Sequence, residues 1–326
     1  FVDALRAAAP VDDIVSAPLS PEESRRAIVV RPGFTVELVA HEPLVVDPVA
    51  IAWDAQARLW VVEMNDYPLG LDGQGKPGGR VKILTDDDGD GRYDRGTTFL
   101  EGLKFPTAVF PWRDGALVCA VPEILFARDT DGDGRADERR TLYTGLHVGN
   151  PQHLANGLRW GLDGWIHCAN GATKTSVKSV LTGKEVDVGT RDFRIHPDTG
   201  DIEPLAGRSQ YLRECDDWGN WFGSSNSNPL YHFPLEERYL RRNPHATYPQ
   251  IQQDVSETPG ASQVFPVSRT VARFNDLSRA NRFTSACSAT IYRDELLGRE
   301  FYGNSFVCEP VHNLVHREIL TPSGAT

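Results

Sequence analysis

The sequence lacks several features that would place it in a common class of protein. It holds a single methionine and no run of about 18 apolar residues, so nothing in it predicts a membrane-spanning helix. It has no block rich in lysine and arginine, and its formal net charge is −11. This balance argues against nucleic acid and against an anionic membrane surface as partners.

Several catalytic and metal-binding motifs are also missing. No G-x-S-x-G, H-E-x-x-H, CxxC or CxxCH stretch occurs, so no nucleophile elbow, zinc-peptidase helix, zinc ribbon or c-type haem site is predicted. The five cysteines are an odd number and cannot all pair with one another. Cys287 and Cys308 lie in neighbouring strand-like runs, where they either form a disulfide or remain buried thiols.

The sequence does contain a repeated acidic stretch. DDDGDGRYD begins at Asp86 and DTDGDGRAD begins at Asp129, with acidic residues, Gly and Asp spaced as at the start of a calcium loop. Position 12 is Thr97 or Arg140 instead of glutamate, and strand-like runs flank both stretches, so we expect hairpin loops and not EF-hands. Calcium is expected because clustered carboxylates repel one another, and an acidic turn without an ion is the alternative. The candidate ligands are Asp86, Asp88, Asp90, Asp94, Asp129, Asp131, Asp133 and Asp137.

These loops also mark a structural repeat. Gly102 and Gly145 each stand sixteen residues after the first Asp of their loop. Strand pairs around polar turns recur in units of about 45–55 residues, each with about four short strands, which is typical of a propeller. The sequence therefore predicts an all-β fold, a β-propeller of the six-bladed type with an incomplete last blade. We expect an N-terminal arm at 1–30, the propeller at 31–326 and a proline-containing inserted loop at about 243–280.

Polar residues follow the predicted inner strands of this propeller. His153 precedes a strand in NPQHLANG and is a candidate general base, because imidazole titrates near neutrality. A hydrogen-bonded structural histidine is the alternative. The other candidates would line a substrate or cofactor channel, or else serve only in turns and at the solvated rim. They are Glu63, Asn65, Gln152, Asn156, Asn170, Asn226, Asn228 and Glu309.

Two resemblances extend this interpretation. HLANGLRWGLDGWIH resembles the inner-strand motif of soluble pyrroloquinoline-quinone (PQQ) sugar dehydrogenases, in which a histidine eight residues before the Gly of a G-x-D turn takes the substrate's hydroxyl proton. His153 stands eight residues before Gly161. Nearly the whole chain is similar to the propeller region of a bacterial membrane-bound dehydrogenase family, often fused to a CxxCH cytochrome. The motifs that carry this second resemblance are LWVVEMNDYP, the two Asp loops, NPQHLANGLRWGLDGW, CDDWGNWFGSSNSNPLYH, RYLRRNPH, FTSACSATIYR and NSFVCEPVHNLVHR.

The resemblance implies a periplasmic or secreted quinoprotein-like dehydrogenase. It would oxidise a sugar or an alcohol with PQQ and pass electrons to a cytochrome. The sequence departs from the family because it ends at Thr326, without a later Arg-containing W-F-R-P motif and without CxxCH. It is therefore either part of a longer protein or has lost the catalytic apparatus.

Two other functions remain open at this stage. One is a non-catalytic accessory or docking subunit of a periplasmic or membrane electron-transfer complex, respiratory or photosynthetic. The other is a carbohydrate-binding propeller without turnover. Propellers serve all of these functions, so the fold alone does not choose among them.

Overall fold

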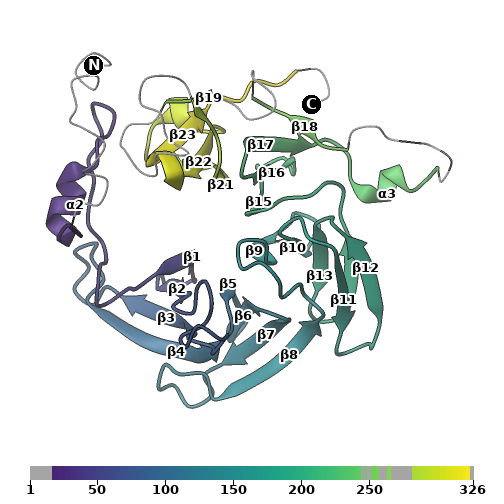
Figure 1. The fold of residues 1–326 in the computed structure, drawn as a ribbon, viewed down its shortest axis with the longest axis horizontal. Helices are drawn as coiled ribbons and strands as arrows, with labels where there is room; N and C mark the ends of the chain where they lie inside the picture. Colours follow the sequence, from purple (N-terminus) through teal and green to yellow (C-terminus); the bar gives the residue numbers. More distant parts are fainter. Residues whose placement is uncertain are drawn as a thin grey trace. The chain divides into compact units, whose positions relative to one another are not determined.

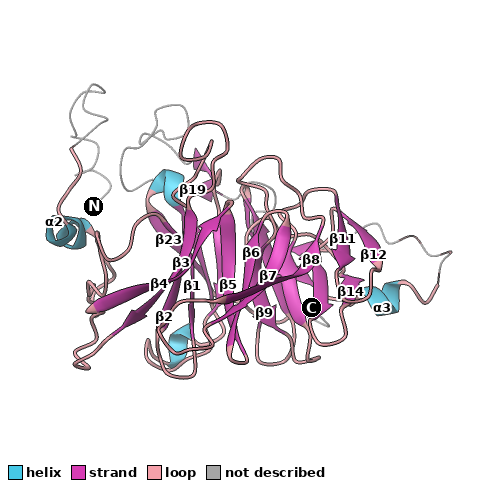
Figure 2. Ribbon diagram, turned by 90° about the horizontal axis from the view of Figure 1, so that it is seen from below, coloured by secondary structure: helices cyan, strands magenta, loops and turns pink. Residues whose placement is uncertain are grey.

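The computed structural model describes residues 17–243, 245, 247, 251–256, 263–265 and 281–323. The chain divides into two compact units, an N-terminal unit, Val15–Thr144, and a C-terminal unit that covers Gly145–Thr326. Strands dominate both units (Figures 1 and 2). Most of the insertion predicted at 243–280 lies outside the described residues, and so does the first half of the arm predicted at 1–30.

The N-terminal unit contains two antiparallel groups of four strands, purple to blue in Figure 1. The first group has the order β1-β2-β3-β4 and comprises β1 (Pro48–Trp53), β2 (Leu59–Glu63), β3 (Gly79–Thr85) and β4 (Arg95–Leu103). In the second group each strand pairs with the next, and the members are β5 (Pro106–Trp112), β6 (Gly115–Ala120), β7 (Glu123–Arg128) and β8 (Glu138–Thr144).

One hydrophobic core joins these two groups of strands. β1 and β2 both contact β5. Ala50 and Ala52 of β1 point into the core, while the alternating residues of the same strand point away from it. The Trp60 ring packs edge-on against Phe99 at 4.7 Å between ring centroids. The buried aromatic and aliphatic side chains thus hold the first two sheets against each other.

The C-terminal unit contains three further sheets and a two-stranded ladder. The first has the order β14-β13-β10-β9 and comprises β9 (Asn156–Trp160), β10 (Ile166–Ala169), β13 (Phe193–His196) and β14 (Asp201–Pro204). The hairpin of β11 (Thr175–Ser179) and β12 (Glu185–Gly189) lies between β10 and β13 in the sequence and is not part of this sheet. The second comprises β15 (Arg213–Cys215), β16 (Trp221–Ser225), β17 (Asn228–Phe233) and β18 (Gln253–Asp254). The third comprises β21 (Cys287–Ile291), β22 (Ser305–Glu309) and β23 (Leu314–Glu318), and β19 (Gln263–Val264) pairs with β20 (Asn281–Arg282).

Helices are short in the described residues. They are α2 (Pro21–Ala27), α3 (Glu237–Leu240) and the 3₁₀ turns η1 (Arg299–Phe301) and η2 (Pro310–His312). Helix α2 begins with a capping box, because Ser20 Oγ accepts from the Glu23 amide and the Glu23 carboxylate accepts from the Ser20 amide. Within the described ranges no helix has the length and apolar character needed to cross a membrane.

A turn that begins with aspartate recurs between the first two strands of three sheets. The carboxylates of Asp54, Asp163 and Asp216 each accept a hydrogen bond from the amide two residues further along, at 2.9–3.0 Å. Their second oxygen accepts from a side chain near the start of the following strand. This local pattern repeats because the strand–turn–strand unit repeats. With two sheets in the N-terminal unit and three in the C-terminal unit, the described strands form five blades of an all-β propeller, the fold that the sequence predicted.

His167 on β10 is a buried histidine in the C-terminal unit. Its ring stacks on Trp221 at 3.8 Å between ring centroids, and Nε2 lies 3.0 Å from Asp163 Oδ2. Nδ1 has no hydrogen-bond partner among the described residues. Protonation would therefore create a buried N–H without an acceptor. Burial lowers the pKa of His167 to about 4, although the Asp163 carboxylate opposes this shift.

The depressed pKa of His167 predicts that the protein loses stability as the pH falls. The unfolded chain takes up this proton near pH 6.5, but the folded chain takes it up only near pH 4. Protonation thus favours unfolding across that window, and the free energy of unfolding should fall by roughly 3 kcal/mol. Urea unfolding between pH 7 and pH 4 measures this loss.

A matched pair of variants isolates the contribution of His167. H167Q should flatten the stability profile over the window, and H41Q, which changes an exposed histidine, should leave it unchanged. An identical slope in H167Q and the wild-type protein would contradict the assignment.

Candidate functional site

The two Asp-rich stretches are hairpin loops, as predicted from the sequence. The first connects β3 to β4 and the second connects β7 to β8. The carboxylate of the first residue, Asp86 or Asp129, accepts hydrogen bonds from two glycine amides of its own loop at 2.6–2.9 Å. The two loops therefore share one backbone conformation. Hydrogen bonds from Gly134 and Gly132 lower the pKa of Asp129, against a smaller opposing effect of burial.

Three carboxylates come together in each loop. Oxygens of Asp86, Asp88 and Asp94 lie within 4.8 Å of one another, and so do oxygens of Asp129, Asp131 and Asp137. Asp90 and Asp133 do not join these groups, and each accepts instead from the amide two residues ahead. Because hard cations prefer oxygen ligands, both groups could hold a metal ion such as calcium.

Each loop also donates a backbone hydrogen bond to a part of the chain that comes before its own sheet in the sequence. The amide at the eighth position, Tyr93 in the first loop and Ala136 in the second, donates to a carbonyl at 2.9 and 2.7 Å. The acceptors are Val39 and, on β4 of the neighbouring sheet, Phe99. An ordered second loop therefore ties the two sheets of the N-terminal unit together.

Calcium is predicted to stabilise the protein through these loops. At a calcium concentration of about 100 times Kd, each site should add roughly 2.7 kcal/mol, which raises Tm by about 5 °C or more. Differential scanning calorimetry with calcium and then with EDTA measures this change. The double variant D131N/D137N should lose about half of the effect, while D87N, outside either triad, should keep it. An unchanged Tm would contradict metal binding.

Two predicted channel residues, Glu63 and Asn65, lie in the N-terminal unit. Glu63 at the end of β2 is fully buried and forms ion pairs with Arg80 and Lys82, the latter at 3.2 Å. Its Oε1 also accepts from the Val46 amide at 2.9 Å. The carboxylate is therefore occupied by contacts with its own sheet and with the segment just before it. Asn65 is partly buried, and its Oδ1 makes no hydrogen bond within the part of the chain that the structure describes.

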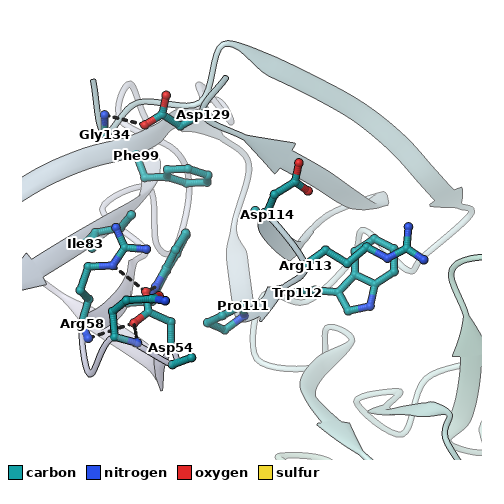
Figure 3. A pocket seen from close by; sticks show the side chains of 14 residues that line it. Asp54, Arg58, Ile83, Phe99, Pro111, Trp112, Arg113, Asp114, Asp129 and Gly134 are labelled. Carbon is teal, nitrogen blue, oxygen red and sulfur yellow. Dashed lines mark hydrogen bonds and ion pairs between the residues drawn. The ribbon is translucent and has the colours of Figure 1, made fainter. Parts of the chain in front are cut away.

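A pocket of about 670 Å³ lies between the two sheets of the N-terminal unit (Figure 3). It was not predicted, since its walls come from turns far apart in the sequence. Its charged groups already have partners, because Asp54 binds Arg58 at 2.7 Å and Asp114 binds Arg128 at 2.9 Å. Of the predicted site residues only Asp129 lines it. The lining residues are Asp54, Ala55, Gln56, Arg58, Trp60, Ile83, Phe99, Pro111, Trp112, Arg113, Asp114, Gly115, Asp129 and Gly134.

His153, the candidate base, lies just before β9 in the C-terminal unit. Its Nδ1 is 3.1 Å from the carbonyl oxygen of Gly171. A carbonyl only accepts, so Nδ1 carries the hydrogen and Nε2 carries the lone pair. Gly171 has a positive φ of 69°, and a Cβ there would lie 2.5 Å from the His153 backbone. Glycine thus allows the close approach that fixes the ring's tautomer.

Gln210 connects His153 to two other predicted residues. Its side-chain amide donates to His153 Nε2 at 3.3 Å, and its Oε1 accepts from the Asn226 amide at 3.2 Å. Its carbonyl accepts from Asn156 Nδ2 at 2.8 Å. Nothing in the sequence identified Gln210, because it belongs to no motif and its partners are 16 to 57 residues away.

The remaining predicted residues of the C-terminal unit lie at varying distances from this network. The Asn226 carbonyl accepts from the Ala286 amide at 3.1 Å, and Ser285 donates to the buried Glu309 at 2.6 Å, which links Glu309 to the network. Asn170 is buried and bonds to local carbonyls. Asn228 pairs with Asp254, and Gln152 is exposed beside Tyr211.

The groups around His153 do not fit PQQ. This quinone carries several carboxylates and would need cationic partners. The hydrogen-bond partners of the His153 ring in the described residues are a backbone carbonyl and the Gln210 amide, and Asn156 and Asn226 extend the set with further amides. In the described part of the chain no guanidinium or ammonium group bonds to this set. The sequence-based expectation of PQQ is therefore unsupported.

Together the repeated sheets, the Asp loops and the His153 network define a β-propeller with two acidic loops and a neutral polar site. The family model described as a domain of unknown function (DUF7133) matches residues 20–326, so the chain belongs to that family. This description names no dehydrogenase. No curated protein sequence matches the chain.

Solved structures similar to the chain have low sequence identity to it. A luciferin-regenerating enzyme is 10% identical over 80% of this chain and 68% of its own, with a TM-score of 0.42. Streptogramin B lyase is 11% identical over 87% and 97%, with a TM-score of 0.39. A structural genomics protein of unknown function from Bacteroides thetaiotaomicron is 11% identical over 83% and 68%, with a TM-score of 0.34.

Proposed function

We propose that this propeller binds a hydroxyl-bearing small molecule, a sugar or an alcohol, beside His153 and takes part in its oxidation. The observation that carries the proposal is the fixed tautomer of His153. Because Nδ1 donates to the Gly171 carbonyl, Nε2 offers a lone pair to an incoming hydroxyl. The neutral amides of Gln210 and Asn226 suit an uncharged, hydroxyl-rich ligand better than an acidic one.

Oxidation of an alcohol carbon removes one proton and one hydride equivalent. His153 Nε2 would take the hydroxyl proton, and a separate molecule that accepts two electrons would take the hydride. Gln210 would orient the ring through its hydrogen bond to Nε2 and give way to the substrate hydroxyl. Electrons would then pass to a cytochrome. We place this reaction in the periplasm or outside the cell.

A dye-linked assay tests this proposal. The calcium-loaded protein is given a panel of sugars and alcohols with a two-electron dye acceptor, with and without added PQQ. We expect turnover with at least one compound and its loss in H153N. Binding of a sugar without turnover would favour the carbohydrate-binding alternative. If no compound of the panel were bound or oxidised, the proposal would be excluded.

A second candidate function is supported by the outward face of β1. Val49, Ile51 and Trp53 alternate along this strand and are 50, 46 and 59% exposed. Large apolar side chains gathered on one face favour a protein interface. The partner would be a subunit of a membrane-associated electron-transfer complex. Native mass spectrometry tests this function by looking for a stable complex with such a subunit. A complex that I51E/W53E abolishes, together with no turnover by the wild-type protein, would favour this function over the first.

A further inference from the structure

Cys287 and Cys308 lie directly opposite each other in the third sheet of the C-terminal unit. β21 and β22 pair antiparallel, and these two residues are register partners. Directly opposed residues of an antiparallel pair project from the same face, with Cβ atoms about 4.5–5.5 Å apart. Both kinds of antiparallel pair have Cα separations inside the range of about 4.4–6.8 Å that a disulfide spans. A disulfide has Cβ atoms about 3.5–4.5 Å apart, so the two sulfurs can bond when the Cβ atoms lie at the close end of the antiparallel range.

A β-bulge creates this pairing. The register shifts between Cys287 and Thr290, and Ser288 has a positive φ of 57°. In an unbroken ladder that runs back from Thr290 and Phe306, Cys287 would lie opposite the buried Glu309. The extra residue moves Cys287 to the face that carries the exposed Cys308.

The other three cysteines have a different environment. Cys119, Cys168 and Cys215 are buried, and in the described ladders none of them lies opposite another cysteine. One pair and three isolated thiols thus account for the odd number of cysteines.

We propose that Cys287 and Cys308 form a disulfide that joins β21 to β22 when the protein meets a disulfide oxidant, while the other three cysteines remain thiols. This inference is independent of the proposed function. With oxidised glutathione, the exposed Cys308 thiolate attacks one glutathione sulfur and releases a glutathione thiolate. The Cys287 thiolate then attacks the Cys308 sulfur of the mixed disulfide and releases the second glutathione. The two protein thiols lose two protons and two electrons, and glutathione gains them.

The reactivity of the pair follows from its surroundings. Burial raises the pKa of Cys287 to about 11, and partial desolvation by neighbouring groups raises the pKa of Cys308, whose side chain still reaches the surface. Because the thiolate is the attacking species, the bond should form slowly near neutrality and about tenfold faster for each added pH unit.

Mass spectrometry of the whole protein tests the proposal. The protein is equilibrated with an oxidising mixture of reduced and oxidised glutathione, quenched with acid, unfolded and alkylated without reduction. We expect three alkylated cysteines, Cys119, Cys168 and Cys215, and a tryptic digest with one cross-linked species that joins Cys287 to Cys308. After reduction all five cysteines should be alkylated.

Two variants complete the test. C308S should yield four alkylated cysteines without reduction, with Cys287 among them, and C215S should retain the cross-link. Five alkylated cysteines in the wild-type protein would overturn the proposal. So would glutathione that stays attached to Cys308, because it would show that the exposed thiol reacts while the pair fails to close.

Discussion

Replacing Asp192 by asparagine is expected to destabilise the C-terminal unit by about 3–5 kcal/mol, among the largest effects of a single substitution in this protein. Asp192 is fully buried. Its carboxylate pairs with the buried Arg213 at 3.1 Å and accepts from Ser209 Oγ at 2.7 Å. The amides of Asn170 and Ser209 donate to the same carboxylate at 3.1 and 2.8 Å. The uncharged side chain would leave the guanidinium of Arg213 buried without its counter-ion.

A double variant separates the cost of leaving Arg213 unpaired from the net contribution of the Asp192–Arg213 ion pair to stability. D192N/R213M removes both charges and should recover much of the stability lost in D192N, because burying two charges is itself costly. E236Q breaks the exposed ion pair with Arg238 and should leave the stability close to that of the wild-type protein. Urea unfolding gives these free energies. A loss in D192N as small as that in E236Q would contradict the structural role of Asp192.

Replacing His153 by asparagine is expected to lower kcat at least 100-fold with a smaller change in KM. General-base catalysis contributes about 10²–10⁴-fold, and asparagine has no lone pair of comparable basicity to take the hydroxyl proton. The substitution keeps a polar side chain that can still donate to the Gly171 carbonyl. Steady-state kinetics with the best compound from the panel and the dye acceptor measure both constants.

Two control variants show whether the loss belongs to the imidazole. Q210L removes the amide that donates to His153 Nε2 and should change kcat/KM by only about fivefold, the value of one neutral hydrogen bond. H41Q changes an exposed histidine and should leave the kinetics as in the wild-type protein. If H153N kept wild-type kcat, His153 would be a structural histidine and the proton would need another acceptor.

The features predicted correctly from the sequence are those set by local geometry. Glycines and carboxylates at fixed spacing determine the Asp loops, since Asp86 and Asp129 accept from amides three and five residues ahead. The strand pairs around turns also followed from local patterns, because Asp54, Asp163 and Asp216 each organise the turn that contains them.

The features that the sequence did not reveal depend on contacts between distant residues. Gln210 and Asp192 stand in no motif, yet they bond to residues brought together by the packing of separate sheets. Asp90 and Asp133 were expected among the metal ligands from their spacing, but their carboxylates do not belong to the two triads. Periodicity identifies strands, and it does not identify which side chains meet across them.

Calorimetric titration of the calcium-loaded protein measures directly whether a hydroxyl-bearing ligand binds at His153. The compound that gives the highest turnover is titrated into the wild-type protein, H153N and H41Q. We expect one binding site per chain in the wild-type protein and in H41Q, and an affinity at least fivefold weaker in H153N because one hydrogen bond to the ligand is lost. Equal affinity in all three proteins would contradict this expectation, since the ligand would then bind away from His153.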